Sequence, residues 1–154
     1  MPRRKIQPEK AMAKRKQARD AALSPAVAPG YPGFRSPCPV ASALDLFGDR
    51  WTLVVVRTII AGRKRYGELA DIPEGVATNI LADRLEKLER YGIVAKRPYQ
   101  GNPPRFEYRL TRAGADLLPI LQALAVWSAR HIPHRWRNPP WFDHGKPEDF
   151  YPAD

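Results

Sequence analysis

The sequence IVAKRPYQGNPPRFEYRLT, residues 93–111, holds two runs of strand-forming residues on either side of a turn. Phe106, Tyr108 and Leu110 alternate with charged residues, which is typical of a strand with one buried face. Between the runs, residues 101–104 (GNPP) combine glycine and asparagine, which permit a tight reversal, with two prolines. The segment predicts a half-buried β-hairpin with basic residues beside its tip.

Two helices precede the hairpin. Residues 78–91 place Leu81, Leu85 and Leu88 on one stripe, which is the pattern of an amphipathic helix. Residues 66–70 are long enough for a short helix, and a glycine-containing turn separates the two. A short and a longer helix joined by a turn, with a hairpin after them, indicate a winged helix-turn-helix.

Residues 51–61 (WTLVVVRTIIA) are nearly all apolar and would suit either a buried strand or a buried helix. The run is longer than a usual strand, Asp49 stands where a helix N-cap belongs, and Gly62 stands where a helix stops. We therefore expect a buried central helix. The fold class is then mainly α with one small β-hairpin.

Further helices are expected over residues 40–47 and over residues 112–131, the second capped by Thr111 and open to a kink at Pro119. The last helix carries a broad apolar band, more than one small domain needs to bury. We expect a partner subunit to cover part of it.

The chain has 154 residues, and 26 Lys and Arg against 16 Asp and Glu give a net charge of +10, which favours a polyanionic partner. Three regions are predicted: a basic flexible arm (1–37), a packed domain (38–131) and a tail rich in proline and aromatic residues (132–154). The tail is either disordered or packed over the surface through its aromatic residues. No stretch approaches the length of a membrane span and no secretory signal is visible, so a cytoplasmic location is expected.

Several short motifs occur in a telling order, among them CPV at 38–40, DRW at 49–51, RYGEL at 65–69 and YG at 91–92. With them, the chain resembles the HxlR-type winged-helix transcriptional regulators of bacteria over about residues 38–129. The resemblance implies a homodimer joined through the first and last helices. It also implies two recognition helices in successive major grooves of double-stranded DNA, and control of nearby promoters.

The start of the helix over residues 78–91 is placed to read bases. Asn79 can pair with adenine through two hydrogen bonds, and Thr78 can contact a thymine methyl group. Asp83 either favours the helix dipole or accepts from a cytosine amino group. Arg84 either contacts DNA or forms an ion pair within the domain, with Asp45, Glu68 or Glu86 as candidate partners. The predicted recognition-helix residues are Thr78, Asn79, Asp83, Arg84 and Lys87.

A second set of residues is placed to meet phosphates. It consists of the basic cluster before the short helix together with the polar residues of the hairpin, whose alternative role is that of a solvated charged surface. The predicted backbone and wing contacts are Arg63, Lys64, Arg65, Lys96, Arg97, Asn102 and Arg105.

Enzymatic and cofactor-dependent functions find little support in the sequence. His131, His134 and His144 lie at or beyond the end of the last helix, without a nucleophile nearby, and no phosphate-binding glycine loop occurs. We expect no catalysis, no cofactor and no metal, although these histidines with Asp143 are the residues that a metal would need.

Cys38, the one cysteine, cannot form an intrachain disulfide. It is either a small apolar residue packed under the first helix or a thiol that senses oxidants or electrophiles, as the cysteine at the matching place does in some members of the family that the chain resembles. Two alternatives to plain DNA binding therefore stay open: a regulator gated through Cys38, and a winged-helix module for protein–protein contacts.

Overall fold

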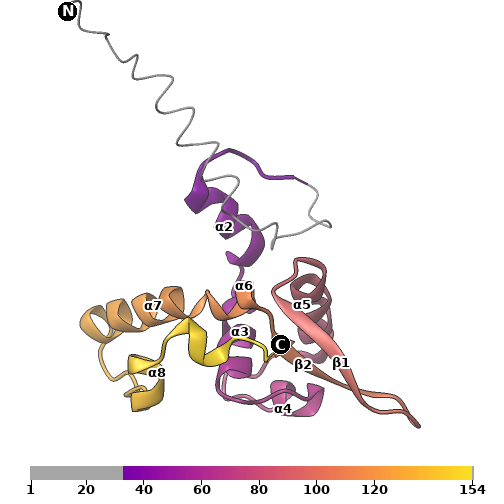
Figure 1. Cartoon of the computed structure of the whole chain (residues 1–154). Helices are drawn as coiled ribbons and strands as arrows, with labels where there is room; N and C mark the ends of the chain where they lie inside the picture. The colour runs from indigo at the N-terminus through magenta and orange to yellow at the C-terminus, as the bar shows by residue number, and fades with distance from the viewer. Residues whose placement is uncertain (1–32, 154) are drawn as a thin grey trace, which may run out of the picture.

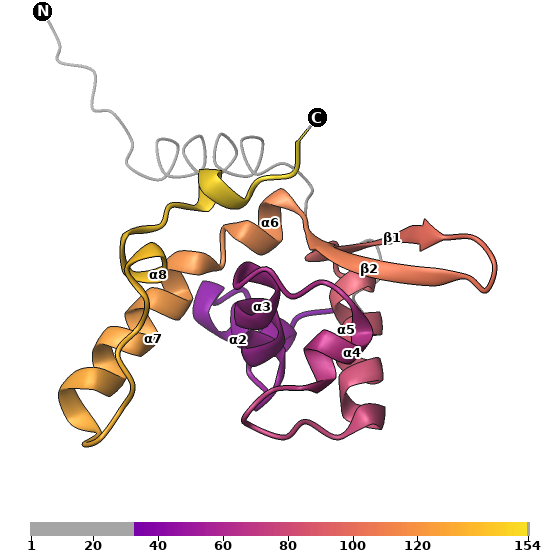
Figure 2. The same ribbon diagram turned by 90° about the horizontal axis from the view of Figure 1, so that it is seen from below.

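The computed structural model describes residues 33–153. The predicted arm, residues 1–37, lies outside the described residues except for its last five. The elements are arranged as Figures 1 and 2 show. In chain order they are α2 (Pro39–Phe47), α3 (Thr52–Ile60), α4 (Tyr66–Ala70), α5 (Thr78–Arg90), β1 (Val94–Gln100), β2 (Arg105–Leu110), α6 (Arg112–Ala115), α7 (Leu118–His131), α8 (Pro140–His144) and the 3-10 turn η1 (Pro147–Phe150).

The core forms where α5 packs on α3. The predicted leucine stripe of α5 is buried, with Leu81, Leu85 and Leu88 each no more than 1% exposed. The run predicted as a buried central helix is helical, as α3, and its side chains Val55 and Val56 are equally inaccessible. An almost wholly apolar helix is stable here because neighbouring elements cover it on several sides.

Both ends of α3 follow from the residues beside it. The Asp49 carboxylate accepts hydrogen bonds from the amides of Trp51 (2.8 Å) and Thr52 (3.0 Å), which satisfies donors that have no partner inside the helix. After the helix, Gly62 adopts a φ of 94°, a left-handed conformation that residues with a side chain avoid. The predicted stop at Gly62 is therefore confirmed, and Asp49 satisfies free amides of α3 as expected, although the N-cap position itself is taken by Trp51.

The predicted hairpin is confirmed as an antiparallel pair in which Val94 faces Leu110 and Arg97 faces Glu107. Its base is buried, with Val94 2% and Leu110 8% exposed, whereas the tip projects away from the body (Figure 2). An irregularity between Pro98 and Gln100 shifts the register toward the tip.

The prediction of one continuous helix over residues 112–131 is wrong. Thr111 caps a first turn as expected, its hydroxyl accepting from the Gly114 amide at 3.1 Å, but α6 ends at Ala115 and α7 begins at Leu118. The cause is Pro119, which has no amide hydrogen and whose ring would collide with the carbonyl one turn earlier. Proline instead occupies the first turn of a new helix, where neither defect matters.

The C-terminal tail packs against the domain. Phe142 is 5% exposed, and the Gln122 side-chain amide donates to the carbonyls of Phe142 (2.7 Å) and Gly145 (3.0 Å). Of the aromatic residues in the tail, Trp136 stays 81% exposed. No helix in residues 33–153 has both the length and the hydrophobicity that crossing a membrane requires.

Candidate nucleic-acid interface

A hydrogen bond joins the first residues of the helices α4 and α5. The Tyr66 hydroxyl at the start of α4 donates to the carbonyl of Thr78 at the start of α5, at 2.7 Å. Glu68 caps α4 by accepting from the amides of Lys64 (2.9 Å) and Arg65 (3.0 Å). The hydrogen bonds from Arg65 and then Lys64 lower the pKa of Glu68 below its ordinary value. The Tyr66 hydrogen bond thus ties the starts of the two helices together, and Glu68 fixes the first turn of α4.

The first two residues of α5, Thr78 and Asn79, are exposed. Within the part of the chain that the structure describes, neither side chain makes a hydrogen bond to another residue, and Ala77 supplies no side-chain cap. The end of α5 therefore presents an amide and a hydroxyl whose hydrogen-bonding capacity is unused.

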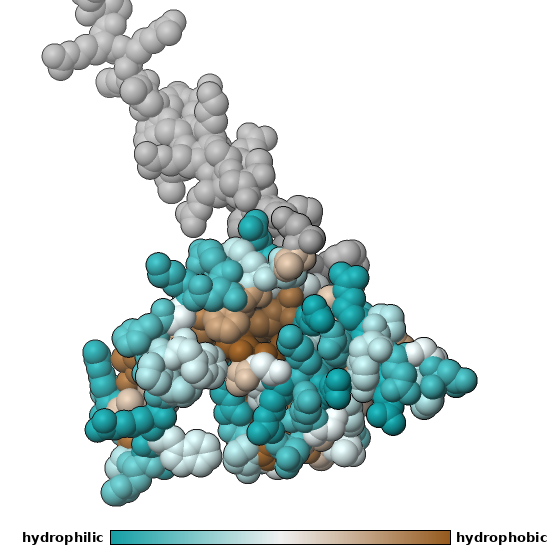
Figure 3. All heavy atoms as spheres, turned by 60° about the horizontal axis from the view of Figure 1, so that its bottom comes forward, coloured by the Kyte–Doolittle hydropathy of each residue, from teal (hydrophilic) through white to brown (hydrophobic). Residues whose placement is uncertain are grey.

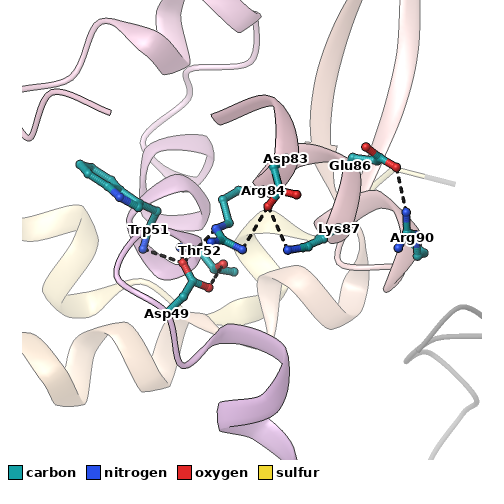
Figure 4. A network of polar contacts seen from close by, with 8 residues as sticks. All are labelled: Asp49, Trp51, Thr52, Asp83, Arg84, Glu86, Lys87 and Arg90. Atoms are coloured by element: carbon teal, nitrogen blue, oxygen red, sulfur yellow. Dashed lines mark hydrogen bonds and ion pairs between the residues drawn. The ribbon is translucent and has the colours of Figure 1, made fainter. Parts of the chain in front are cut away.

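Further along α5, the charged residues predicted for the recognition helix form an ion-pair network (Figure 4). Asp83 contacts Arg84 Nη1 at 3.2 Å and Lys87 Nζ at 3.0 Å, and Arg84 Nε lies 3.2 Å from Asp49 Oδ1. Arg84 is largely covered, with its side chain 24% exposed. It joins α5 to the turn before α3.

Of the two roles considered for Arg84, the structure has the intradomain ion pair, but the partners predicted for it are wrong. Asp45 pairs with Arg35, Glu86 pairs with Arg90 (2.8 Å), and Glu68 caps α4. Asp49 was assigned only the capping of α3. It performs both tasks because the turn before α3 lies against the middle of α5, a proximity that no sequence spacing reveals.

The two sides of the hairpin carry different residues. One side, here called the α5-side face, lines a groove of about 360 Å³ together with Arg65 and Tyr66 of the loop and helix before α5. Lys96 Nζ sits 4.4 Å from the centroid of the Phe106 ring, and the Arg65 guanidinium lies 4.5 Å from that of Tyr99, so cations rest over aromatic rings. The hairpin residues of this face are Lys96, Tyr99, Pro104, Arg105, Phe106 and Tyr108.

The opposite side, here called the reverse face, is formed by Ala95, Arg97, Pro98, Glu107 and Arg109. Because successive side chains of a strand point to opposite sides, Lys96 and Arg97 cannot approach the same surface. Of the predicted wing contacts, Lys96 and Arg105 lie on the α5-side face and Arg97 lies on the reverse face. Asn102 is exposed in the turn between the strands.

The three cations of the basic cluster before α4 also point to different surfaces. Arg63 Nη1 donates to the carbonyls of Glu68 (3.2 Å) and Asp71 and thereby braces the end of α4. Lys64 lines a cavity on the reverse face of the hairpin, and its carbonyl accepts from the Tyr108 amide at 2.8 Å. Of the three predicted cations, Arg65 alone belongs to the α5-side face.

Cys38 is exposed at the N-cap position of α2, so the alternative in which it packs under the helix is wrong. The Pro39 ring that follows and the exposed first turn leave its thiol open to solvent. Over residues 33–153, no three His, Cys, Asp or Glu side chains come together as metal ligands would.

The Asp49 carboxylate gives a pH-dependent prediction. Burial would raise its pKa, but hydrogen bonds from the Thr52 hydroxyl and from the amides of Trp51 and Thr52, with the charge of Arg84, hold the pKa below the ordinary 3.8. The unfolded chain therefore binds a proton at a higher pH than the folded protein does. The ionised Asp49 carboxylate therefore stabilises the folded protein fully above pH 3.8, and this stabilisation is lost as the pH falls through the lowered pKa.

We expect the wild-type protein to be more stable than Asp49→Asn near neutral pH, and the difference to shrink in urea unfolding at about pH 3. Asparagine keeps one capping oxygen but loses the charge, so the comparison isolates the ionised form. A difference between the two proteins that is independent of pH would contradict the assignment.

A helix pair followed by a hairpin, with exposed polar residues at the start of the second helix and cations on the adjoining face of the hairpin, defines a winged helix-turn-helix protein. The model of HxlR-like helix-turn-helix proteins matches residues 46–136. The chain therefore belongs to the family of HxlR-like helix-turn-helix proteins.

Two relatives illustrate the likeness. An uncharacterized HTH-type transcriptional regulator of Mycobacterium tuberculosis (strain H37Rv) is 40% identical over 101 residues, which cover 66% of this chain and 63% of the relative. One from Synechocystis is 38% identical over 87 residues, 56% of this chain and 64% of the relative. The chain thus spans less than two thirds of the length of these relatives.

Solved structures extend the likeness to the fold. The reduced form of the transcriptional regulator YodB from Bacillus subtilis matches with a TM-score of 0.54 at 27% identity, covering 66% of this chain and all of YodB. The redox regulator HypR in its reduced form matches with a TM-score of 0.55 at 32% identity, covering 62% of this chain and 95% of that one.

Sequence reasoning missed the aromatic residues of the α5-side face. Tyr99 and Phe106 appeared only as strand formers, yet each lies beneath a cation. The alternation of Phe106 with charged residues was a usable signal for its side of the strand. For Tyr99 no such signal exists, because the register shift beside it alters the side on which it emerges.

Proposed function

We propose that the protein binds palindromic double-stranded DNA as a homodimer, with the start of α5 in the major groove and the α5-side face of the wing on the phosphate backbone. The observation that carries the proposal is the pairing of unused polar side chains at Thr78 and Asn79 with the cationic face of the wing beside them. Base edges need such donors and acceptors, and phosphates need cations.

The predicted residues of α5 and of the α5-side face take separate roles within this proposal. Asn79 pairs with adenine and Thr78 contacts a thymine methyl group, whereas Arg84 positions α5 through Asp49. Asp83 and Lys87 neutralise each other at 3.0 Å, so they reach bases only by exchanging that pair for one with DNA. Phosphate contacts fall to Arg65, Lys96 and Arg105, with Asn102 at the tip.

The net charge of +10, to which the basic arm over residues 1–37 contributes, supports a strong electrostatic component of DNA binding. We propose that this arm contributes to general affinity without altering the preferred sequence. Since its target is chromosomal DNA, the protein would act in the cytoplasm of a bacterial cell, by binding rather than by catalysis.

The homodimer is supported by apolar side chains that a single chain leaves exposed on α2 and α7. On α2, Val40 is 67% and Leu44 52% exposed; on α7, Leu124 is 50% and Trp127 59% exposed. Figure 1 shows α2 standing away from the rest of the domain, and Figure 3 shows a hydrophobic area open on the surface. Apolar surface of this kind is stabilised when a second subunit covers it.

The test is to select DNA bound by the purified full chain from a random pool. We expect an imperfect palindrome whose half-sites are about 10 base pairs apart, or a multiple of that spacing, and an affinity that falls steeply with salt. Recovery of no preferred sequence, together with a shallow salt dependence, would contradict the proposal. That result would favour the alternative of a winged-helix module for protein–protein contacts.

A second candidate function is gating of DNA binding through Cys38. Its exposure at the start of α2 supports it, as does the likeness to a solved redox regulator and to YodB, which was also solved after diamide treatment. A thiolate at this position would add to a quinone, the ring taking up the proton, and would place a bulky group beside the apolar side chains of α2.

We expect quinone treatment to weaken DNA binding of the native protein by about tenfold or more and to leave Cys38→Ser unaffected. The measurement is DNA affinity before and after treatment, with the mass shift confirming modification. Full affinity in a modified protein would exclude the gated regulator and leave the DNA-binding proposal intact.

A further inference from the structure

A cavity of about 740 Å³ lies on the reverse face of the wing. Three separate parts of the chain line it: the end of α3 with the loop after it, the two strands of the hairpin, and the C-terminal residues 149–153. In Figure 2 the C-terminal end, in yellow, runs past α6 near the base of the hairpin. The volume is within the range of small-molecule binding sites, about 300 to 1,000 Å³.

The wall that the tail contributes is held in place by specific contacts. The Tyr151 hydroxyl donates to Asp116 Oδ1 at 2.7 Å, and the Arg112 guanidinium lies 4.5 Å from the centroid of the Tyr151 ring. The hydrogen bond to Asp116 and then burial raise the pKa of Tyr151 above its ordinary value, so the hydroxyl keeps its proton. Residues 149–153 follow the segment that matches the family, residues 46–136. The cavity thus depends on an extension of this chain.

The floor of the cavity is apolar. Ile59 and Ile60 at the end of α3 are each 4% exposed, and Leu110 at the base of the hairpin is 8% exposed. Phe150 and Tyr151 add aromatic rings from the tail. An apolar ring would gain hydrophobic stabilisation here by leaving water.

The rim carries unbalanced positive charge. Arg109 is neutralised by Glu107. The Asp149 carboxylate accepts from the Lys146 amide at 2.9 Å and keeps its charge, so the three cations of the lining exceed its two carboxylates by one. Lys64 and Arg97 also line the cavity, and within residues 33–153 neither side chain is paired with a carboxylate. Two unpaired cations beside an apolar floor match an anion attached to an apolar body.

We propose that this cavity binds a small aromatic carboxylate. The Arg97 guanidinium holds the carboxylate through two parallel hydrogen bonds, Lys64 adds a second charge, and the ring lies against Ile60 and Phe150. Arg97 neighbours Lys96 in β1, so a ligand held on the reverse face also constrains the face proposed to contact DNA. The effect of the ligand on DNA binding rests on the proposed function, whereas binding of the carboxylate itself does not.

The test is titration of the full chain with 2-naphthoate by calorimetry, with neutral 2-naphthamide as a matched probe. We expect a dissociation constant below about 1 mM for the naphthoate and binding at least about tenfold weaker for the amide. Arg97→Gln should weaken naphthoate binding by about tenfold or more. Arg105→Gln removes the same charge from a residue of the same hairpin that does not line this cavity, and it should change naphthoate binding by less than about twofold.

Absence of binding at millimolar naphthoate would overturn the proposal, as would equal affinity for acid and amide or an unchanged affinity in Arg97→Gln. Any of these results would mean that the reverse face is not a carboxylate site. DNA binding by the unliganded protein is measured separately. A protein that binds naphthoate but not DNA would keep the ligand site and lose the proposed regulatory function.

Discussion

Replacing Trp127 with Asp is expected to convert a dimer into a monomer and to lower the affinity for palindromic DNA by about a hundredfold or more. Trp127 is 59% exposed on α7, and Leu124 lies three residues earlier on the same side of the helix. Burial of a large apolar side chain contributes about 2 to 3 kcal/mol. A two-fold interface contains every substitution twice, and the carboxylate would be buried without a partner.

The measurement is sedimentation of the native and variant proteins at micromolar concentration, with DNA affinity determined in parallel. The control is Ala61→Asp, which adds the same charge at an exposed position after α3, away from α2 and α7. This control should remain dimeric and lose only the small electrostatic contribution of one charge per subunit. A native protein that sediments as a monomer, or a Trp127→Asp protein that stays a dimer, would contradict the proposed interface.

Local sequence signals were sufficient for most elements of the fold. The helix α3 was recognised because its cap at Asp49 and its stop at Gly62 lie beside it in the chain, and these signals outweighed the strand propensity of its valines and isoleucines. The last helix shows the limit of such signals. Pro119 was noticed, but whether a proline kinks a helix or starts a new one depends on how the flanking turns pack.

The candidate site could be predicted less completely, because its geometry depends on contacts between distant segments. The exposed start of α5 followed from the leucine stripe, which fixes the outward side of the helix. The pairing of Arg84 with Asp49 did not follow, since the residues belong to different elements. The separation of Lys96 from Arg97 follows from strand alternation, and was overlooked when both were grouped as one basic wing.

The tail illustrates a different limit. Its prolines and aromatic residues show no period, so the sequence left two alternatives open, a disordered segment or one packed over the surface. The fastening contacts are single pairs, such as Tyr151 with Asp116, 35 residues apart. Pairs of this kind have no sequence signature, yet they build one wall of the cavity on the reverse face.

Asn79→Ala and Arg105→Ala should weaken DNA binding in different ways. In the proposed complex, removing the Asn79 amide takes away two hydrogen bonds to a base edge. It should cost about 1 to 3 kcal/mol at the preferred site and relax the preference at one position of each half-site. Removing the Arg105 charge should weaken binding to all sequences alike and reduce the salt slope by about one per lost phosphate contact on each subunit.

The control for the lost charge is Arg109→Ala, in the same strand as Arg105 but on the reverse face and already paired with Glu107. Its effect on the salt slope should be much smaller, because its guanidinium is not placed to release a counterion from DNA. Affinities for the selected palindrome and for unrelated DNA, each over a range of salt, separate the two kinds of loss. If Asn79→Ala and Arg105→Ala lose specificity equally, or if Arg109→Ala matches Arg105→Ala in salt dependence, the α5-side face does not meet the phosphates. The side of the wing that contacts DNA would then have to be reassigned.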